Sequence, residues 1–135
     1  MNFDRVSRYW PETLSIVRIV VGLLFIEHGS AHLLGFPTTP NPAPAMMTLL
    51  WIQGVIELVG GLLLAIGLFT RPVSFILAGD MAVAYFMVHA PKSFFPLLNG
   101  GDDAILYCFL FLVFFVAGPG RWSIDRTHSP SGDVR

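Results

Sequence analysis

The sequence predicts an all-α protein that crosses a membrane as a four-helix bundle. Only 13% of its 135 residues are charged, whereas 54% are hydrophobic, and an ordinary soluble domain has about 25% charged residues. The hydrophobic residues also form four long runs, and a helix needs about 20 such residues to cross roughly 30 Å of hydrocarbon. Residues 1–135 are therefore expected to form a single transmembrane domain in contact with the lipid bilayer.

Proline and glycine mark the boundaries between the four runs. The connecting segments are the proline-rich stretch 35–45, the turn Thr70-Arg71-Pro72, and a longer loop that ends in Asn99-Gly100-Gly101-Asp102. Such residues favour turns and interrupt helices. The four spans are expected at about residues 13–34, 47–69, 73–90 and 103–118.

Two other interpretations of the apolar runs are disfavoured. A soluble bundle needs a polar face on each helix, and Ile19–Ile26 and Leu58–Leu68 leave no room for one. A cleaved signal peptide would explain the first run, but that run is long and contains Arg18, Glu27 and His28. Four membrane-spanning helices remain the prediction.

The distribution of Lys and Arg predicts that both termini lie in the cytoplasm. Positively charged short loops tend to stay on the cytoplasmic side of the membrane. With four spans, the side of the termini carries Arg5, Arg8, Arg71, Arg121, Arg126 and Arg135, and the other side has only Lys92. We therefore expect a multi-pass protein of the cytoplasmic, or inner, membrane.

Charge and cysteine content exclude several functions. The net charge is -1 and the eight Lys and Arg residues are spread thinly, so no basic face is available for nucleic acid. The single cysteine, Cys108, excludes an internal disulfide, a CxxC redox pair and a cysteine-rich zinc site.

Ionisable residues inside the spans are the most informative, because each costs about 2.5 to 3.5 kcal/mol at mid-membrane when it is charged. Arg18 and Asp80 lie about five and seven residues from the inner ends of their expected spans. The difference in depth is about 3 Å, so a structural ion pair between them is expected. The spans contain seven such residues: Arg18, Glu27, His28, His32, Glu57, Asp80 and His89.

Glu57 is expected near the midplane of the bundle, where an ionisable residue suggests a functional site. Its carboxylate has three candidate partners: His28 at similar depth, Arg18 below it, or a proton of its own. Small residues flank Glu57 on one face of the helix and let another backbone approach closely. That face serves either an internal contact or self-association into a homo-oligomer; its residues are Gly54, Gly61 and Ala65.

Three histidines gather at the outer end of the expected bundle. His28 and His32 are four residues apart and share a helix face, His89 reaches a similar depth, and Asp102, Asp103 and Tyr107 begin the fourth span. The cluster is suited to a quinone-like head group with histidine and carboxylate carrying protons. Zinc or copper, haem, and histidines that merely satisfy one another are the alternatives. The candidate ligand-binding residues are His28, His32, Glu57, His89, Asp102 and Tyr107, with no complete metal-ligand set.

Four blocks of sequence resemble the DoxX family of small four-helix membrane proteins. The first block is Arg18, Gly22, Phe25 and His28-Gly29, and the second is Glu57 with Gly60-Gly61, followed by Gly67-Leu68 and Thr70-Arg71. The third is Phe94-Phe95-Pro96 with Asn99-Gly100-Gly101-Asp102, and the fourth runs from Gly118-Pro119-Gly120 to Trp122-Ser123 and Asp125. The sequence departs from the family pattern at His32, where many relatives have Lys, and at Asp102, which is often Glu.

The resemblance implies a four-helix bundle with both termini inside and an association with redox biology. Members of the family include subunits of a thiosulfate:quinone oxidoreductase and membrane partners of oxidative-stress proteins, but the resemblance implies no particular substrate or reaction here. Two function classes follow. The protein is either a redox-associated subunit that binds a quinone-like ligand, or a structural component that assembles with a membrane or redox protein partner.

Overall fold

The computed structural model describes residues 3–40 and 44–129, and every regular element in them is helical. This confirms the predicted all-α fold. The long helices are α2 (Trp10–Leu34), α3 (Leu49–Ile66), α4 (Thr70–Ala84) and α6 (Asp102–Ala117). Beyond α4 the chain continues as the π-helix η1 (Tyr85–His89) and the 3-10 helix η2 (Ala90–Lys92). The short helices are α1 (Asp4–Ser7), α5 (Pro96–Asn99) and α7 (Ile124–His128).

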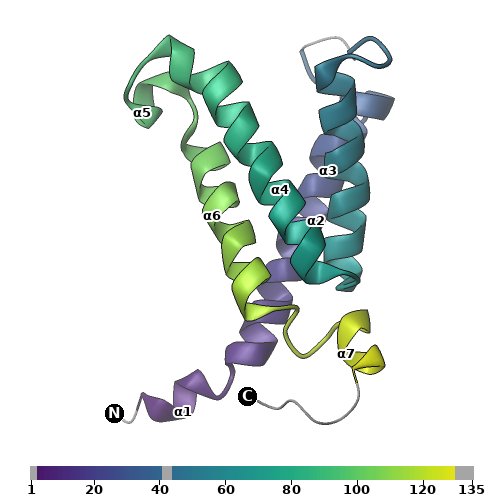
Figure 1. Cartoon of the computed structure of the whole chain (residues 1–135), viewed down its shortest axis with the longest axis vertical. Coiled ribbons are helices and arrows are strands. Elements are labelled where there is room, and N and C mark those ends of the chain that lie inside the picture. The colour runs from purple at the N-terminus through teal and green to yellow at the C-terminus, as the bar shows by residue number, and fades with distance from the viewer. Residues whose placement is uncertain (1–2, 41–43, 130–135) are drawn as a thin grey trace.

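Three helical stretches are long and apolar enough to cross a membrane: Trp10–Leu34, Leu49–Ile66 and Thr70–Lys92. The fourth, α6, has 16 residues and is therefore about 24 Å long, shorter than the hydrocarbon thickness of roughly 30 Å. It lies beside α4 and returns the chain to the end of the bundle where α2 begins (Figure 1). The protein is thus a multi-pass membrane bundle with one short helix.

The expected turn at residues 70–72 is wrong, because Thr70, Arg71 and Pro72 form the first turn of α4. Proline is tolerated in a first turn, where its missing N–H has no helical partner to lose. The turn begins instead at Gly67, directly after α3. The backbone φ of Gly67 is 70°, a conformation that glycine adopts easily because it has no Cβ. Asp125 then caps α4 by accepting hydrogen bonds from the backbone nitrogens of Phe69 and Thr70 at 2.7 and 2.8 Å.

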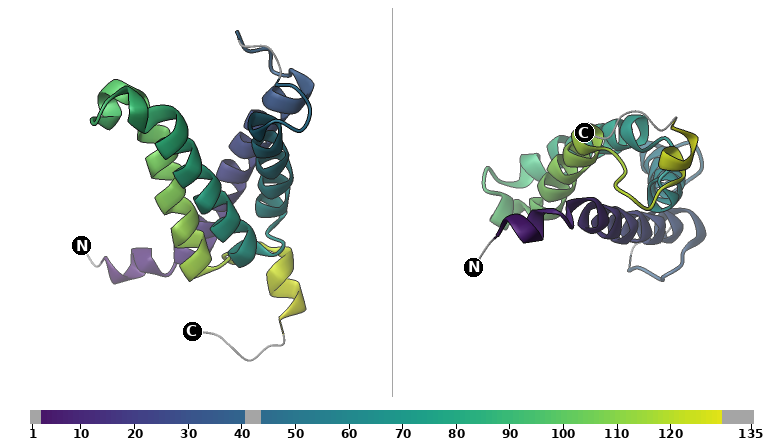
Figure 2. Two further views of the ribbon diagram at one scale, coloured as in Figure 1. Left: turned by 45° about the horizontal axis from the view of Figure 1, so that its top comes forward. Right: turned by 90° about the horizontal axis from the view of Figure 1, so that it is seen from below.

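The four long helices form two pairs. Helix α2 packs along α3 and α6 packs along α4, and contact between α3 and α4 joins the pairs. The pairs meet at the end that carries α1 and α7 and diverge towards the end that carries α5 (Figures 1 and 2). We call these the α7 end and the α5 end. The divergence places the interior of the α5 end between four helices.

Glycines set the close approach of α2 and α3. A methyl group on Gly22 would lie 2.6 Å from the backbone nitrogen of Ala65, and one on Gly61 would lie 2.7 Å from that of Ile26. These distances are too short for any real Cβ contact. The small-residue face of α3 therefore makes an internal contact with α2.

Arg18 does not pair with Asp80, contrary to the expectation. The Arg18 side chain is fully buried and donates hydrogen bonds to four backbone carbonyls. Two are at the end of α3 and two follow α6; they belong to Leu64 (2.8 Å), Ala65 (3.4 Å), Pro119 and Trp122 (2.5 Å). The expectation failed because Arg18 contacts Leu64, near the end of α3, whereas Asp80 lies beside Gln53 near the start of α3. These two positions on α3 are about 16 Å apart along the helix axis.

Candidate ligand-binding site at the α5 end

A cavity of about 230 Å³ lies between the two helix pairs, towards the α5 end. All four long helices contribute to its wall, as do η1 and the loop before α6. Five ionisable side chains from all the long helices except α4, and from η1, line it. The lining residues are Phe25, His28, Gln53, Glu57, Met81, Ala84, His89, Gly100, Asp103, Ala104 and Tyr107.

Four of the six predicted site residues line this cavity: His28, Glu57, His89 and Tyr107. Asp102 does not line it; the carboxylate there belongs to its neighbour Asp103. Successive helical residues are rotated by about 100°, so the exact start of α6 decides which of the two acids faces inward.

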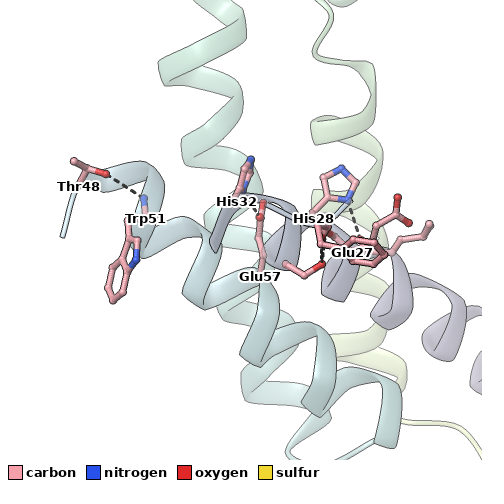
Figure 3. Close-up of polar contacts among 9 residues, drawn as sticks. Glu27, His28, His32, Thr48, Trp51 and Glu57 are labelled. Carbon is pink, nitrogen blue, oxygen red and sulfur yellow. Dashed lines mark hydrogen bonds and ion pairs between the residues drawn. The ribbon is translucent and has the colours of Figure 1, made fainter. Parts of the chain in front are cut away.

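His32 lies outside the cavity wall and is hydrogen-bonded to Glu57. Its Nδ1 lies 2.9 Å from Glu57 Oε2, and the Glu57 side chain is 4% exposed (Figure 3). Neither His28 nor Arg18 is the partner, contrary to two of the expected alternatives. Side chains lean towards the N-terminus of their helix, and α2 and α3 are antiparallel. Glu57 therefore leans towards the α5 end and His32 leans back to meet it.

His28 and His89 are oriented in the same way although they come from different helix pairs. His28 Nδ1 donates to the backbone carbonyl of Leu24 at 2.8 Å, and His89 Nδ1 donates to that of Asn99 at 3.0 Å. A carbonyl can only accept, so Nδ1 carries the proton in each ring. The other nitrogen, Nε2, has no hydrogen-bond partner within the described residues. Both rings are therefore available to a ligand in the cavity.

The π-helix η1 ends at His89 and was not expected from the sequence. The Ala90 N–H donates to the Tyr85 carbonyl, one residue further back than in an α-helix. The signal was Pro91, which lacks the N–H that an α-helix would direct to Met87 and whose ring crowds that carbonyl. The wider turn places His89 in the cavity wall next to Gly100.

Gln53 and Asp80 form a second polar site that sequence reasoning missed. Gln53, from α3, and Asp80, from α4, line the same groove between these helices. The Asp80 oxygen Oδ2 is buried and has no hydrogen-bond partner among the described residues. A glutamine carries no charge, so the search for ionisable groups passed over it.

The described residues contain no group of three or more His, Cys, Asp or Glu side chains that are placed to hold a metal ion. In particular, His32 is hydrogen-bonded to Glu57 and does not line the cavity that His28 and His89 share.

Comparisons with known proteins agree with the fold. The DoxX family model matches residues 13–90, from α2 to the end of η1. An uncharacterized protein of Haemophilus influenzae is 42% identical over 128 residues, which cover 91% of this chain and 96% of the relative. An uncharacterized membrane protein of Mycobacterium tuberculosis is 28% identical over 86% of this chain and 81% of its own. No solved structure matches significantly. The chain belongs to the DoxX family of membrane proteins.

Proposed function

We propose that the protein is a redox-associated membrane subunit that binds a quinone-type ring in the cavity between its two helix pairs. The observation that carries the proposal is the matched orientation of His28 and His89, each with Nδ1 bonded to a backbone carbonyl and Nε2 without a partner among residues 3–40 and 44–129. A quinone-type ring has an oxygen at each of two opposite positions. Two imidazoles on different walls provide one hydrogen-bonding group for each oxygen.

The size and polarity of the cavity support a single-ring ligand. Its volume of about 230 Å³ is just below the roughly 300 Å³ at which pockets for drug-sized molecules begin. Phe25 and Met81 provide apolar contacts for the faces of a ring, and Tyr107 adds an aromatic edge. The redox association implied by the DoxX resemblance favours a quinone over other ring compounds.

The His32 and Glu57 pair gives such a site a route for protons. Glu57 lines the cavity and is 3% exposed, whereas the His32 side chain that contacts it is 38% exposed. A proton released by a hydroquinone hydroxyl passes to the carboxylate and from there to the imidazole. Histidine is suited to this transfer because its ordinary pKa lies near neutrality. We further propose that a redox protein partner exchanges electrons with the ring.

The experiment is a calorimetric titration of purified protein with a tail-less benzohydroquinone under anaerobic conditions. The wild type should show saturable binding, and His28→Phe should weaken it about fivefold, since one lost hydrogen bond is worth about 1 kcal/mol. His128→Phe is the matched control, because His128 lies in α7 at the other end and is exposed. Absence of saturable binding in the wild type would refute the proposal.

A second candidate function is assembly of a membrane complex without ligand chemistry. The buried Arg18 favours it, because its four backbone hydrogen bonds make this charge a purely structural one. On this proposal, mild extraction of tagged protein from membranes yields one stoichiometric partner, or a homo-oligomer. Recovery of a monodisperse monomer would contradict it.

A further inference from the structure

A groove of about 510 Å³ runs between α3 and α4 at the α5 end, on the outside of the bundle. Its walls are apolar side chains that are largely exposed at the protein surface, such as Leu50 on α3 and Val83 on α4 at 51% each. Both helices belong to membrane-spanning stretches. The groove therefore opens sideways into the bilayer.

The groove and the central cavity meet at a shared wall. Gln53 and Ala84 line both of them, one from each helix. Ala84 presents only a methyl group there, and Gln53 lies beside Asp80, which also lines the groove. A methyl group and a neutral amide thus separate a polar compartment from an apolar one.

We propose that the groove holds the apolar tail of the ligand whose ring occupies the cavity, and that this ligand enters from the bilayer between α3 and α4. The inference rests on the proposed function and narrows it to one chemical class, single-ring quinones with an isoprenoid or alkyl tail. The continuity of the two spaces at Gln53 and Ala84 selects this occupant. The histidines and Glu57 suit the ring oxygens, and the groove suits a chain of methylene groups.

The position of the tail is tested by photocrosslinking. A benzohydroquinone with a ten-carbon tail that ends in a diazirine is bound to the protein in lipid nanodiscs and irradiated. Mass spectrometry should locate most adducts on groove residues such as Ile76, Val83 and Met87, and excess tail-less benzohydroquinone should reduce them at least fivefold. Adducts spread over the exposed residues Val20 and Leu106, or adducts that resist this competition, would overturn the proposal.

A pair of variants separates the groove from the cavity. Val83→Trp fills the groove and should weaken binding of the tailed compound at least fivefold, with binding of the tail-less compound unchanged. Val20→Trp, the same change on an exposed position of α2 outside both spaces, should alter neither. If the tail-less compound binds and Val83→Trp has no selective effect, the groove assignment fails alone. If the tail-less compound does not bind the wild type, the proposed function itself fails.

Discussion

If the cavity binds a quinone-type ring as proposed, two histidine side chains determine which form of the ring it prefers. In His28 and His89 the proton on Nδ1 is used by a backbone carbonyl, so the neutral ring offers only a lone pair at Nε2. A hydroquinone presents two O–H donors, whereas the oxidised quinone presents two acceptors. Neutral histidines in this orientation therefore complement the reduced ring.

We expect the reduced ring to bind more tightly than the oxidised one at a pH at which these histidines are neutral. Two additional hydrogen bonds of about 0.5 to 1.5 kcal/mol each correspond to roughly a tenfold preference or more. Titration of the wild type with a hydroquinone and its quinone, under anaerobic conditions, measures the ratio. In the His28→Phe variant the preference should shrink; equal affinities in the wild type would argue against the assigned tautomers.

Arg18 stabilises the α7 end through backbone carbonyls and not through a carboxylate partner. We expect Arg18→Met to lower the free energy of unfolding by about 3 kcal/mol, because several buried carbonyls lose a charged donor. Arg18→Lys should recover only part of this, since an ammonium lacks the planar fork of donors. Chemical unfolding in detergent measures both.

Asp80→Asn provides the discriminating control for Arg18. The predicted ion pair would make the effects of Arg18→Met and Asp80→Asn strongly non-additive. Arg18 is hydrogen-bonded to the Leu64 carbonyl, whereas Asp80 lies beside Gln53 in the groove, so the double variant should show the sum of the single effects. A coupling energy above about 1 kcal/mol would show that Arg18 and Asp80 form the ion pair after all.

Sequence reasoning found the residue types of the site but not their partners. The depth of an ionisable residue follows from its place in an apolar run, and this placed Glu57 and His28 near the midplane and His89 above them. Partner choice depends on how each helix is rotated and on which helix it faces. Arg18 faces the end of α3 and not Asp80, and Asp103 shares a helix face with Tyr107, so it lines the cavity in place of Asp102.

At the scale of elements, the contact between α2 and α3 holds the wall that carries His28 and Glu57. Backbones approach directly at Gly22 and Gly61, without an intervening side chain. The spacing of the small residues predicted that this face of α3 makes a close helix contact. The spacing could not show whether the partner helix belongs to the same chain or to a second copy, because both contacts require the same residues.

Gly61→Ala should therefore destabilise the protein by about 1 to 3 kcal/mol, because the added methyl overlaps the backbone of Ile26. Gly79→Ala is the matched control, since a Cβ at Gly79 meets nothing within 4 Å. That change should be neutral or stabilise by up to about 1 kcal/mol through helix propensity. Thermal unfolding of the two variants in one detergent checks the difference, and equal midpoints would exclude the backbone contact.

For the whole molecule, the arrangement of cations predicts the orientation. Arg5, Arg8, Arg71, Arg121 and Arg126 belong to segments at the α7 end, and Lys92 lies at the α5 end (Figure 1). The positive-inside rule predicts that the α7 end faces the cytoplasm. In that orientation the cavity would lie in the outer half of the membrane.

We expect a membrane-impermeant maleimide to label cysteine at the α5 end of the protein in intact cells and not at the α7 end. In a Cys108→Ser background, Leu97→Cys and Ser7→Cys place one exposed thiol at each end. Leu97→Cys should react directly, and Ser7→Cys only after the cells are permeabilised. The reverse pattern would invert the orientation, and reaction at both positions would require an odd number of crossings.

The π-turn at residues 85–89 matters for any comparison of this protein with its relatives. One turn there holds an extra residue, so a relative with a regular helix would span the same height with one position fewer. If the two sequences were aligned without a gap, the residues of the relative beyond this turn would be displaced by one position. The residue aligned with His89 would then not be its structural equivalent. A deletion of one residue in this turn would likewise swing the imidazole about 100° around the helix axis.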